Sequence, residues 1–177
     1  MILLSISLVL TNEDPGLFGP AVDSVLHSEG IDWTMYVIDN SADGKFAKYL
    51  QNLDETRIVH IANRRNLGFG AAHNVGIQLG VAHSRYHLIL NPDIRFGKDA
   101  INKMFRYMDA NLDVAVSMPK VIYPDGEFQR LVRKIPTPMH LIGRRFLPDC
   151  AWRNSCSDGS QRFWKEQHTR RYLFCTR

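Results

Sequence analysis

The sequence predicts an α/β fold with a mostly parallel, open sheet. Two observations predict it. Short apolar segments typical of buried strands alternate with stretches of helical spacing, and polar residues directly follow apolar strands, in residues 37–41 and 88–93. Open α/β sheets place their ligands at the carboxyl ends of parallel strands. A length of 177 residues and a hydrophobic content of 45% suit one globular domain with a sizeable core.

The first half of the chain predicts two helices among three strands. Residues 3–10 are apolar and nearly uninterrupted, as expected of a strand buried on both faces, and residues 12–19 have loop composition. Pro20 is expected to open the first helix and Gly30 to end it. The remaining elements expected here are a strand at 34–38, a turn at Asp43-Gly44, a short helix at 46–50 and a strand at 57–61.

The second half continues this alternation, which favours right-handed crossovers between parallel strands. A helix is expected where Ala71, Ala72, Val75, Leu79 and Ala82 recur at helical spacing, followed by a strand at 86–90. Asp99 is a suitable N-cap for the next helix. The inward face of that helix is expected to be Ile101, Met104, Phe105 and Met108. A strand is expected at 113–118, and residues 121–123 and 128–132 are expected to form a hairpin or a β-excursion around the tight turn at Pro124-Asp125-Gly126.

The sequence divides at residue 135 into a predicted α/β domain, 1–135, and a basic tail, 136–177. The tail lacks a sustained apolar period beyond a short helix expected at 139–146, so we expect it to be poorly ordered. Residues 128–177 carry 11 Lys and Arg against 3 Asp and Glu. Such a segment suits the anionic cytoplasmic leaflet or a nucleic acid, or is simply a solvated basic surface. Of these partners we expect peripheral contact with the inner membrane and no nucleic acid.

Several features point to the cytoplasm. Residues 1–10 lack a basic leader and a small-residue cleavage site, so they are interpreted as a strand and not as a signal peptide. No later run approaches the roughly 20 apolar residues that span a bilayer. The three cysteines are odd in number and lack metal-ligand spacing, which a reducing compartment suits best.

Asp39 is the candidate contact to a nucleoside. It ends the second predicted strand, where a carboxylate can accept hydrogen bonds from a base N–H or a ribose hydroxyl. Asn12, after the first strand, would face the same crevice. The alternative for both is turn formation, in which Asp39 caps a turn with Asn40 and Ser41.

The segment 66–76 is the candidate phosphate site. Gly68, Gly70 and Gly76 permit close approach of backbone to a ligand, and a helix amino terminus favours phosphate. Asn66 and Asn74 support a binding role, and Arg64 and Arg65 can reach a diphosphate. One alternative is that the small residues only permit tight packing of a helix on the sheet. The other is a dinucleotide-binding motif, but the segment lacks the third small residue of that motif and follows the third predicted strand instead of the first.

Asn91-Pro92-Asp93 is the candidate metal site. Proline cannot continue the strand's hydrogen bonding, which leaves Asp93 at the carboxyl tip. One carboxylate there suits Mg²⁺ or Mn²⁺ shared with the phosphates of a substrate, and the alternative is a strand-end turn. His73, His83 and His87 lack ligand spacing and are expected to be structural.

Together these motifs resemble the bacterial rhamnosyltransferase-like branch of the family-2 glycosyltransferases, enzymes of the GT-A fold. The resemblance covers roughly residues 5–148 and implies that residues 1–135 form a nucleotide-sugar-binding domain of this fold. It rests on Asp39-Asn40-Ser41, Asn66-x-Gly68-Phe69-Gly70-x-Ala72-x-Asn74-x-Gly76 and Leu90-Asn91-Pro92-Asp93, and on the stretches Pro119 to Gly126, Gln129-Arg130 and Pro136-Thr137-Pro138.

The resemblance implies an inverting transfer from a nucleotide-diphosphate sugar, of the dTDP-rhamnose or UDP-sugar class, to a lipid-linked or cell-surface polysaccharide such as O-antigen. By that resemblance Asp93 would hold Mg²⁺ or Mn²⁺, and the nucleotide would be bound by Asn12, Asp39, Asn66, Gly68, Asn74 and Asn91. The metal would stabilise the departing diphosphate while a carboxylate deprotonates the acceptor hydroxyl.

The chain departs from the family pattern in two places. Thr11 stands where the family often has a tyrosine, and no segment after Leu147 resembles the half that supplies the catalytic base. Asp149, Asp158 and Glu166 do not fit that pattern, so no base is assigned. We therefore expect a truncated enzyme, and the alternative is a non-catalytic remnant that binds a membrane or a partner.

Overall fold

A computed structural model of the chain describes residues 2–123, 125–127, 129 and 171–175. These residues all belong to one compact unit, formed by 1–129 together with 169–177. The predicted boundary at residue 135, the helix expected at 139–146 and most of the strand expected at 128–132 lie outside the described residues.

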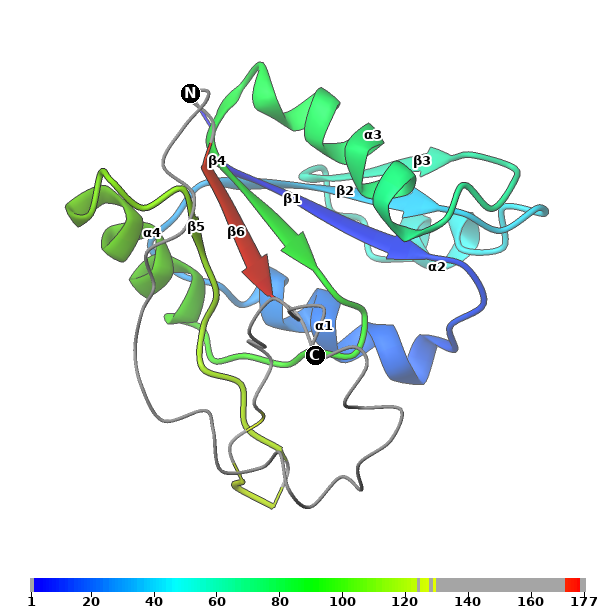
Figure 1. Ribbon diagram of the computed structural model, residues 1–177. Coiled ribbons are helices and arrows are strands. Elements are labelled where there is room, and N and C mark those ends of the chain that lie inside the picture. Colours follow the sequence, from blue (N-terminus) through cyan, green and yellow to red (C-terminus); the bar gives the residue numbers. More distant parts are fainter. Residues whose placement is uncertain (1, 124, 128, 130–170, 176–177) are drawn as a thin grey trace, which may run out of the picture. The chain divides into compact units, whose positions relative to one another are not determined.

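The sheet has six strands, all parallel, in the order β3-β2-β1-β4-β6-β5 (Figure 1). The predicted α/β class with a mostly parallel open sheet is therefore confirmed. The strands, in chain order, are β1 (Ile2–Leu10), β2 (Trp33–Asp39), β3 (Ile58–Ala62), β4 (Ser84–Leu90), β5 (Val116–Ser117) and β6 (Arg171–Cys175).

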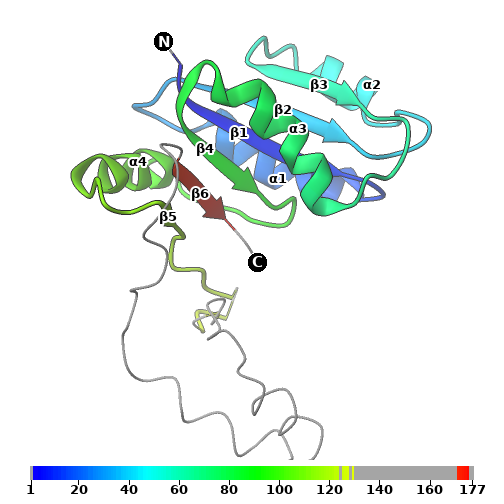
Figure 2. The ribbon, with the colours of Figure 1, turned by 45° about the horizontal axis from the view of Figure 1, so that its top comes forward.

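Helices cover both faces of the sheet (Figure 2). They are α1 (Pro15–Leu26), α2 (Ala47–Asn52), α3 (Phe69–Val81) and α4 (Ala100–Ala110). The apolar side chains of α1, α2 and α4 pack on one face, and α3 packs on the other. Among the helices of the described part, none is both long and apolar enough to cross a bilayer.

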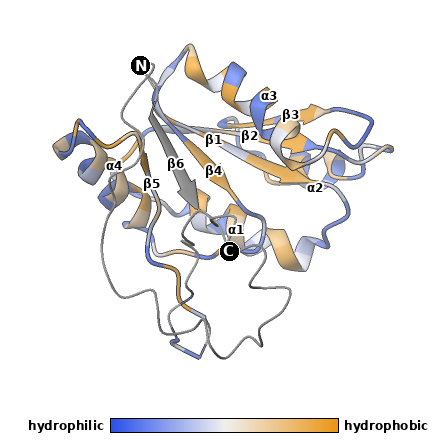
Figure 3. Cartoon of the chain, viewed as in Figure 1, coloured by the Kyte–Doolittle hydropathy of each residue, from blue (hydrophilic) through white to orange (hydrophobic). Residues whose placement is uncertain are grey.

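Strand β1 lies at the centre of the core. Leu4, Ile6, Leu8 and Leu10 are fully buried toward α1, while alternate residues face α3. Figure 3 shows the concentration of apolar residues in the central strands. The expected strand with two buried faces is confirmed, and each buried aliphatic side chain contributes about 1.5–3 kcal/mol.

The first helix begins earlier than the sequence predicts. It starts at Pro15, with Asp14 as N-cap accepting a hydrogen bond from the Gly16 N–H at 2.7 Å, and Pro20 lies inside it. The prediction that Pro20 opens the helix was wrong, because the signal of an acidic cap followed by proline at the first position occurs five residues upstream.

Two further differences concern α4 and the sheet edge. Asp99 does occupy the N-cap position of α4, but its side chain makes no cap bond and pairs instead with Lys103. The strand expected at 113–118 is reduced to Val116–Ser117, and β6 forms within the segment expected to be poorly ordered.

Pro124 of the turn expected at Pro124-Asp125-Gly126 lies outside the described residues, but the residues beside it make backbone hydrogen bonds typical of a hairpin. Tyr123 N–H donates to the Glu127 carbonyl at 2.8 Å, and Gln129 N–H donates to the Val121 carbonyl at 3.0 Å. Gly126 has a φ of 87°, a left-handed conformation that favours glycine.

Candidate functional site

The sheet reverses its direction of growth between β1 and β4. From β1 the chain builds outward through β2 and β3, and it then returns to add β4 on the other side of β1. In an open parallel sheet the crevice for a ligand lies at such a switch point, outside the carboxyl ends of the strands. Leu10 pairs with Asp39, and Asp39 pairs with Ala62, so three of these ends are level with one another.

The predicted site residues lie at this edge. Asn12 follows β1, Asp39 ends β2, and Asn66 and Gly68 lie between β3 and α3. Asn91 and Asp93 follow β4, next to the switch point. Asn12, Asn66, Gly68 and Asn74 are exposed, Asn91 and Asp93 are half-buried, and Asp39 is completely buried.

The Asp39 carboxylate holds the turn that follows β2. Its Oδ1 accepts hydrogen bonds from the Ser41 N–H at 2.8 Å and the Ser41 hydroxyl at 2.5 Å, and its Oδ2 accepts from His60 Nε2 at 3.1 Å. The turn-capping alternative thus describes part of what Asp39 does. Its contact with a nucleoside stays a prediction.

A second set of polar contacts connects this turn to α3. The Asn63 amide donates to Asn40 Oδ1 at 2.8 Å, and Asn40 Nδ2 lies 3.5 Å from Asn66 Oδ1. Asn66 Oδ1 in turn accepts from the Gly68 N–H at 2.8 Å. The turn after β2 and the amino terminus of α3 are therefore held together by side-chain amides.

The glycines of segment 66–76 divide into two roles. Gly68, with a φ of 77°, caps α3 in a conformation that favours glycine, and a Cβ on Gly68 or Gly70 would meet open space. A Cβ on Gly76 would lie 2.7 Å from Ser7 Cβ. The packing alternative is correct for Gly76, whereas Gly68 and Gly70 leave room for a ligand.

Arg64 and Arg65 precede this helix and are both exposed. Arg64 has a φ of 54°, which is unusual outside glycine. The two cations stand in the loop between β3 and α3, on the same edge of the sheet as the other candidate residues, and their role toward a diphosphate stays a prediction.

His73 and His87 are buried between α3 and the sheet, as the structural interpretation expected. Ser7 Oγ lies 2.8 Å from His73 Nδ1 and 2.8 Å from His87 Nε2, and Ser5 Oγ lies 2.7 Å from His87 Nδ1. Burial lowers the pKa of each imidazole from 6.5 to about 4. Both rings are therefore neutral at neutral pH.

The polarity of this network follows from its far end. The Ser84 hydroxyl donates to the Gly80 carbonyl at 2.9 Å, so Ser5, 2.7 Å away, donates to Ser84, and the Tyr86 carbonyl at 3.4 Å is a weaker acceptor for the same proton. His87 Nδ1–H then donates to Ser5, and the Ser7 hydroxyl donates to His87 Nε2. His73 consequently carries its proton on Nδ1, and its Nε2 is a buried acceptor with no hydrogen-bond partner in the described part of the chain.

The tip of β4 offers oxygen ligands. Asn91 Oδ1 is buried and has no hydrogen-bond partner among the described residues, and Asp93 lies two residues further along. The described residues contain no group of three acidic, histidine or cysteine side chains arranged for a metal. The metal site expected at Asp93 stays a prediction.

Sequence reasoning missed two residues of this edge, His60 and Asn63. The side chain of His60 bonds to Asp39, and that of Asn63 bonds to Asn40. Their one signal in the sequence was position. His60 lies near the end of a predicted strand adjacent to β2, and Asn63 follows the same strand, where polar groups meet the crevice.

The fold and this edge define a class: α/β proteins that bind a ligand where parallel strands end. The chain matches the model of glycosyl transferase family 2 over residues 5–169, further along than the resemblance seen in the sequence. The chain therefore belongs to glycosyl transferase family 2.

Relatives agree with this assignment. The chain is 28% identical over 127 residues to an uncharacterized glycosyltransferase of Methanocaldococcus jannaschii, covering 70% of this chain and 43% of that protein. It is 30% identical over 112 residues to the succinoglycan biosynthesis protein ExoO of Rhizobium meliloti, covering 63% and 32%. The chain thus spans less than half the length of these curated relatives.

Solved structures share the fold. Two crystal structures of S. aureus TarS superpose with TM-scores of 0.60 and 0.57, each at 14% sequence identity. They cover 75% and 78% of this chain, and the chain covers 23% and 39% of the respective TarS chains. The likeness confirms the fold class, and the family identifies the chain as a transferase domain.

Proposed function

We propose that this domain binds a nucleotide-diphosphate sugar at the carboxyl edge of its sheet and forms the donor-binding part of an inverting glycosyltransferase. The observation that supports this proposal is that Asp39, Asn66 and Asp93 all lie at the carboxyl edge of the sheet, on both sides of the switch point between β1 and β4. The donor is of the UDP-sugar or dTDP-rhamnose class, as in the rhamnosyltransferase-like branch.

The nucleoside lies against the turn after β2. The Asp39 carboxylate is buried beneath that turn, and Asn40 is bonded to the loop that leads to α3. Asn12 flanks the same crevice from β1. In this proposal the hydrogen-bonding groups for the base and the ribose come from the turns that follow neighbouring strands.

The diphosphate lies toward the amino terminus of α3. Gly68 and Gly70 leave the first turn of the helix open, so its N–H groups and the positive end of the helix dipole are accessible to an anion. Arg64 and Arg65 add two exposed positive charges beside it. Asn74 lies one turn further into the same helix.

Asp93 would hold Mg²⁺ or Mn²⁺, with the Asn91 amide beside it. When bound, the ion neutralises the charge that develops on the departing diphosphate. The protein's own contribution is to orient the donor so that its anomeric carbon faces an acceptor hydroxyl. No catalytic base is assigned to a residue of this chain.

We place the acceptor among lipid-linked or cell-surface polysaccharides, because one relative is named for succinoglycan biosynthesis. This proposal includes O-antigen-type glycans. A cytoplasmic location, with the basic tail in peripheral contact with the inner membrane, accompanies it, since residues 128–177 carry 11 basic against 3 acidic side chains.

Calorimetric titration of the 177-residue chain with UDP and with dTDP, with and without Mn²⁺, tests this function. Asp93→Asn should weaken the metal-dependent binding by about tenfold or more, because it removes the anionic ligand. The control is Asp113→Asn, an exposed carboxylate near the start of β5, which should bind like the wild type. Binding that is unaffected by Asp93→Asn would refute the assigned role of Asp93.

A further inference from the structure

We infer that His60 is a positioning residue of the donor site, which acts by fixing the Asp39 carboxylate. This inference rests on the proposed function, in which the turn after β2 receives the nucleoside. His60 lies on β3, beside β2 in the sheet, and its Nε2 is 3.1 Å from Asp39 Oδ2. A carboxylate oxygen only accepts, so His60 Nε2–H is the donor.

The two carboxylate oxygens of Asp39 have separate partners. Oδ1 is bonded to Ser41, whereas Oδ2 receives its hydrogen bond from His60. The Asp39 side chain is completely buried, so solvent does not replace a lost donor. The bond to His60 therefore fixes the orientation of the Asp39 carboxylate. It also fixes the position of the Ser41 hydroxyl, which donates to Asp39 Oδ1.

Ser41 transmits this orientation to the turn. Its Oγ accepts hydrogen bonds from the backbone N–H groups of Gly44 at 3.0 Å and Lys45 at 3.3 Å, so its own proton points to Asp39. The chain of contacts runs from His60 through Asp39 and Ser41 to the backbone of residues 41–45. These residues follow the end of β2, at the edge where the donor is proposed to bind.

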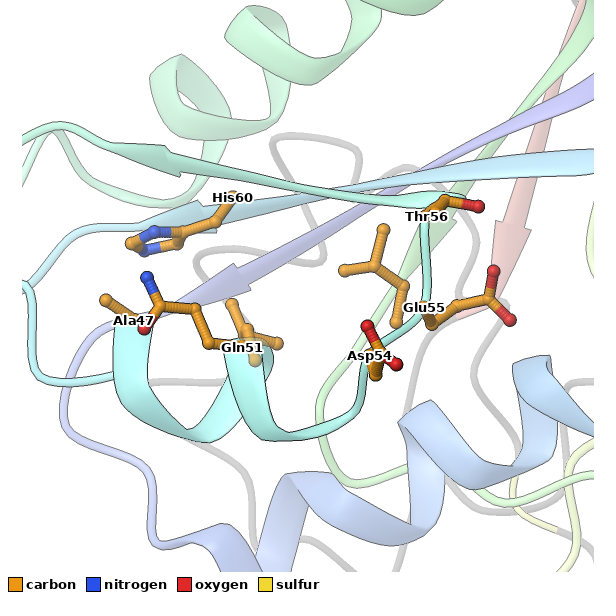
Figure 4. A pocket seen from close by; sticks show the side chains of 8 residues that line it. Ala47, Gln51, Asp54, Glu55, Thr56 and His60 are labelled. Atoms are coloured by element: carbon orange, nitrogen blue, oxygen red, sulfur yellow. The ribbon is translucent and has the colours of Figure 1, made fainter.

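The other side of the His60 imidazole lines a pocket of about 260 Å³ between α2 and β3. Figure 4 shows His60 on β3, with the side chain of Gln51 approaching it from α2. The His60 side chain is 24% exposed, whereas the Asp39 side chain is completely buried. His60 therefore lies between the pocket and the buried carboxylate. Gln51 lines the same pocket, and among the described residues it makes no hydrogen bond to Asp39. It is therefore a matched control.

The test compares three variants by calorimetry with UDP or dTDP in the presence of Mn²⁺. His60→Leu removes the donor and should weaken binding about tenfold, whereas His60→Gln keeps an N–H at a similar reach and should bind within about threefold of the wild type. Gln51→Leu changes the pocket alone and should bind like the wild type. Equal binding by wild type and His60→Leu, equal losses in His60→Leu and His60→Gln, or an equal loss in Gln51→Leu would overturn the inference.

A double-mutant cycle shows whether His60 acts through Asp39. In the Asp39→Asn background, His60→Leu should cause no further loss of affinity. Nitrogen-15 spectra of the wild-type chain supply a measurement that needs no variant: His60 should carry a proton on Nε2, and a proton on Nδ1 alone would refute the inference. If the folded wild type binds neither nucleotide, the proposed function fails and the inference fails with it, whereas wild-type binding with an additive double mutant refutes the inference alone.

Discussion

At the scale of single residues, the structure separates glycines that pack from glycines that leave space. A Cβ on Gly80 would lie 2.5 Å from Ser5 Cβ, and one on Gly76 would lie 2.7 Å from Ser7 Cβ. A Cβ on Gly70, in the same helix, would meet nothing within 4 Å. The small residues of α3 therefore permit close contact with β1 at one end and an accessible helix amino terminus at the other.

This difference predicts opposite effects of the same substitution on stability. Gly80→Ala should destabilise the fold by about 1–3 kcal/mol, because the new methyl group overlaps a buried strand. Gly70→Ala should be neutral or stabilising by up to about 1 kcal/mol, since alanine favours the helix. Urea unfolding of both variants measures this. Equal stabilities for the two variants would contradict the packing described for α3.

At the scale of elements, α3 is held on the sheet by a buried polar network as well as by apolar contacts. His73 from α3, Ser7 from β1 and His87 from β4 are joined by bonds of 2.8 Å. Such a network stabilises the packing only while its imidazoles are neutral, because a buried positive charge without a counter-charge is costly.

The low pKa values of His73 and His87 predict an acid-sensitive fold. Each imidazole has a pKa of about 4 when folded, against 6.5 ordinarily, so the unfolded chain binds more protons between these values. The stabilising contribution is complete above about pH 6.5 and is lost as the pH falls toward 4, on the order of 3 kcal/mol for a single imidazole. Denaturant unfolding across this range measures the loss.

The acid response can be separated from that of other groups. The hydrogen bond from Arg57 lowers the pKa of Glu55 to about 2, so its contribution is lost below 4.5, in a lower window. The variant His83→Gln, which removes an exposed imidazole between α3 and β4, should keep the wild-type profile. A flat stability curve between pH 6.5 and 4.5 would contradict the account of the network.

At the scale of the whole molecule, the alternation of strands and helices could be predicted from the sequence, because the buried strands are short apolar runs. The order of strands brought Asn12, Asp39 and Asp93 to one edge, as the motifs predicted. The start of helix α1 at Pro15 was not predicted, because Asp14 and Pro15 lie in a segment whose composition also suits a loop. Strand β6 was not predicted, because residues 171–175 lie in a segment with no sustained apolar period around them.

The site was predicted less completely than the fold. Motifs identify residues near strand ends, but they do not show which side chains hold one another. His60 and Asn63 therefore emerged only from the parallel pairing of β2 with β3, which places both next to the Asp39 turn. The burial of Asp39 could likewise not be predicted from the sequence, because it depends on the conformation of residues 41–45, where Ser41 bonds to Asp39 and to the backbone of the turn.

We expect a nucleotide diphosphate to bind at the carboxyl edge of this sheet. Amide hydrogen exchange of the full chain with UDP or dTDP and Mn²⁺ tests it most directly. Binding at this edge should slow exchange at residues 40–45, 63–70 and 91–96 in the presence of at least one nucleotide. Unchanged exchange with both nucleotides, or slowing confined to the opposite edge at residues 28–33 and 82–85, would contradict it.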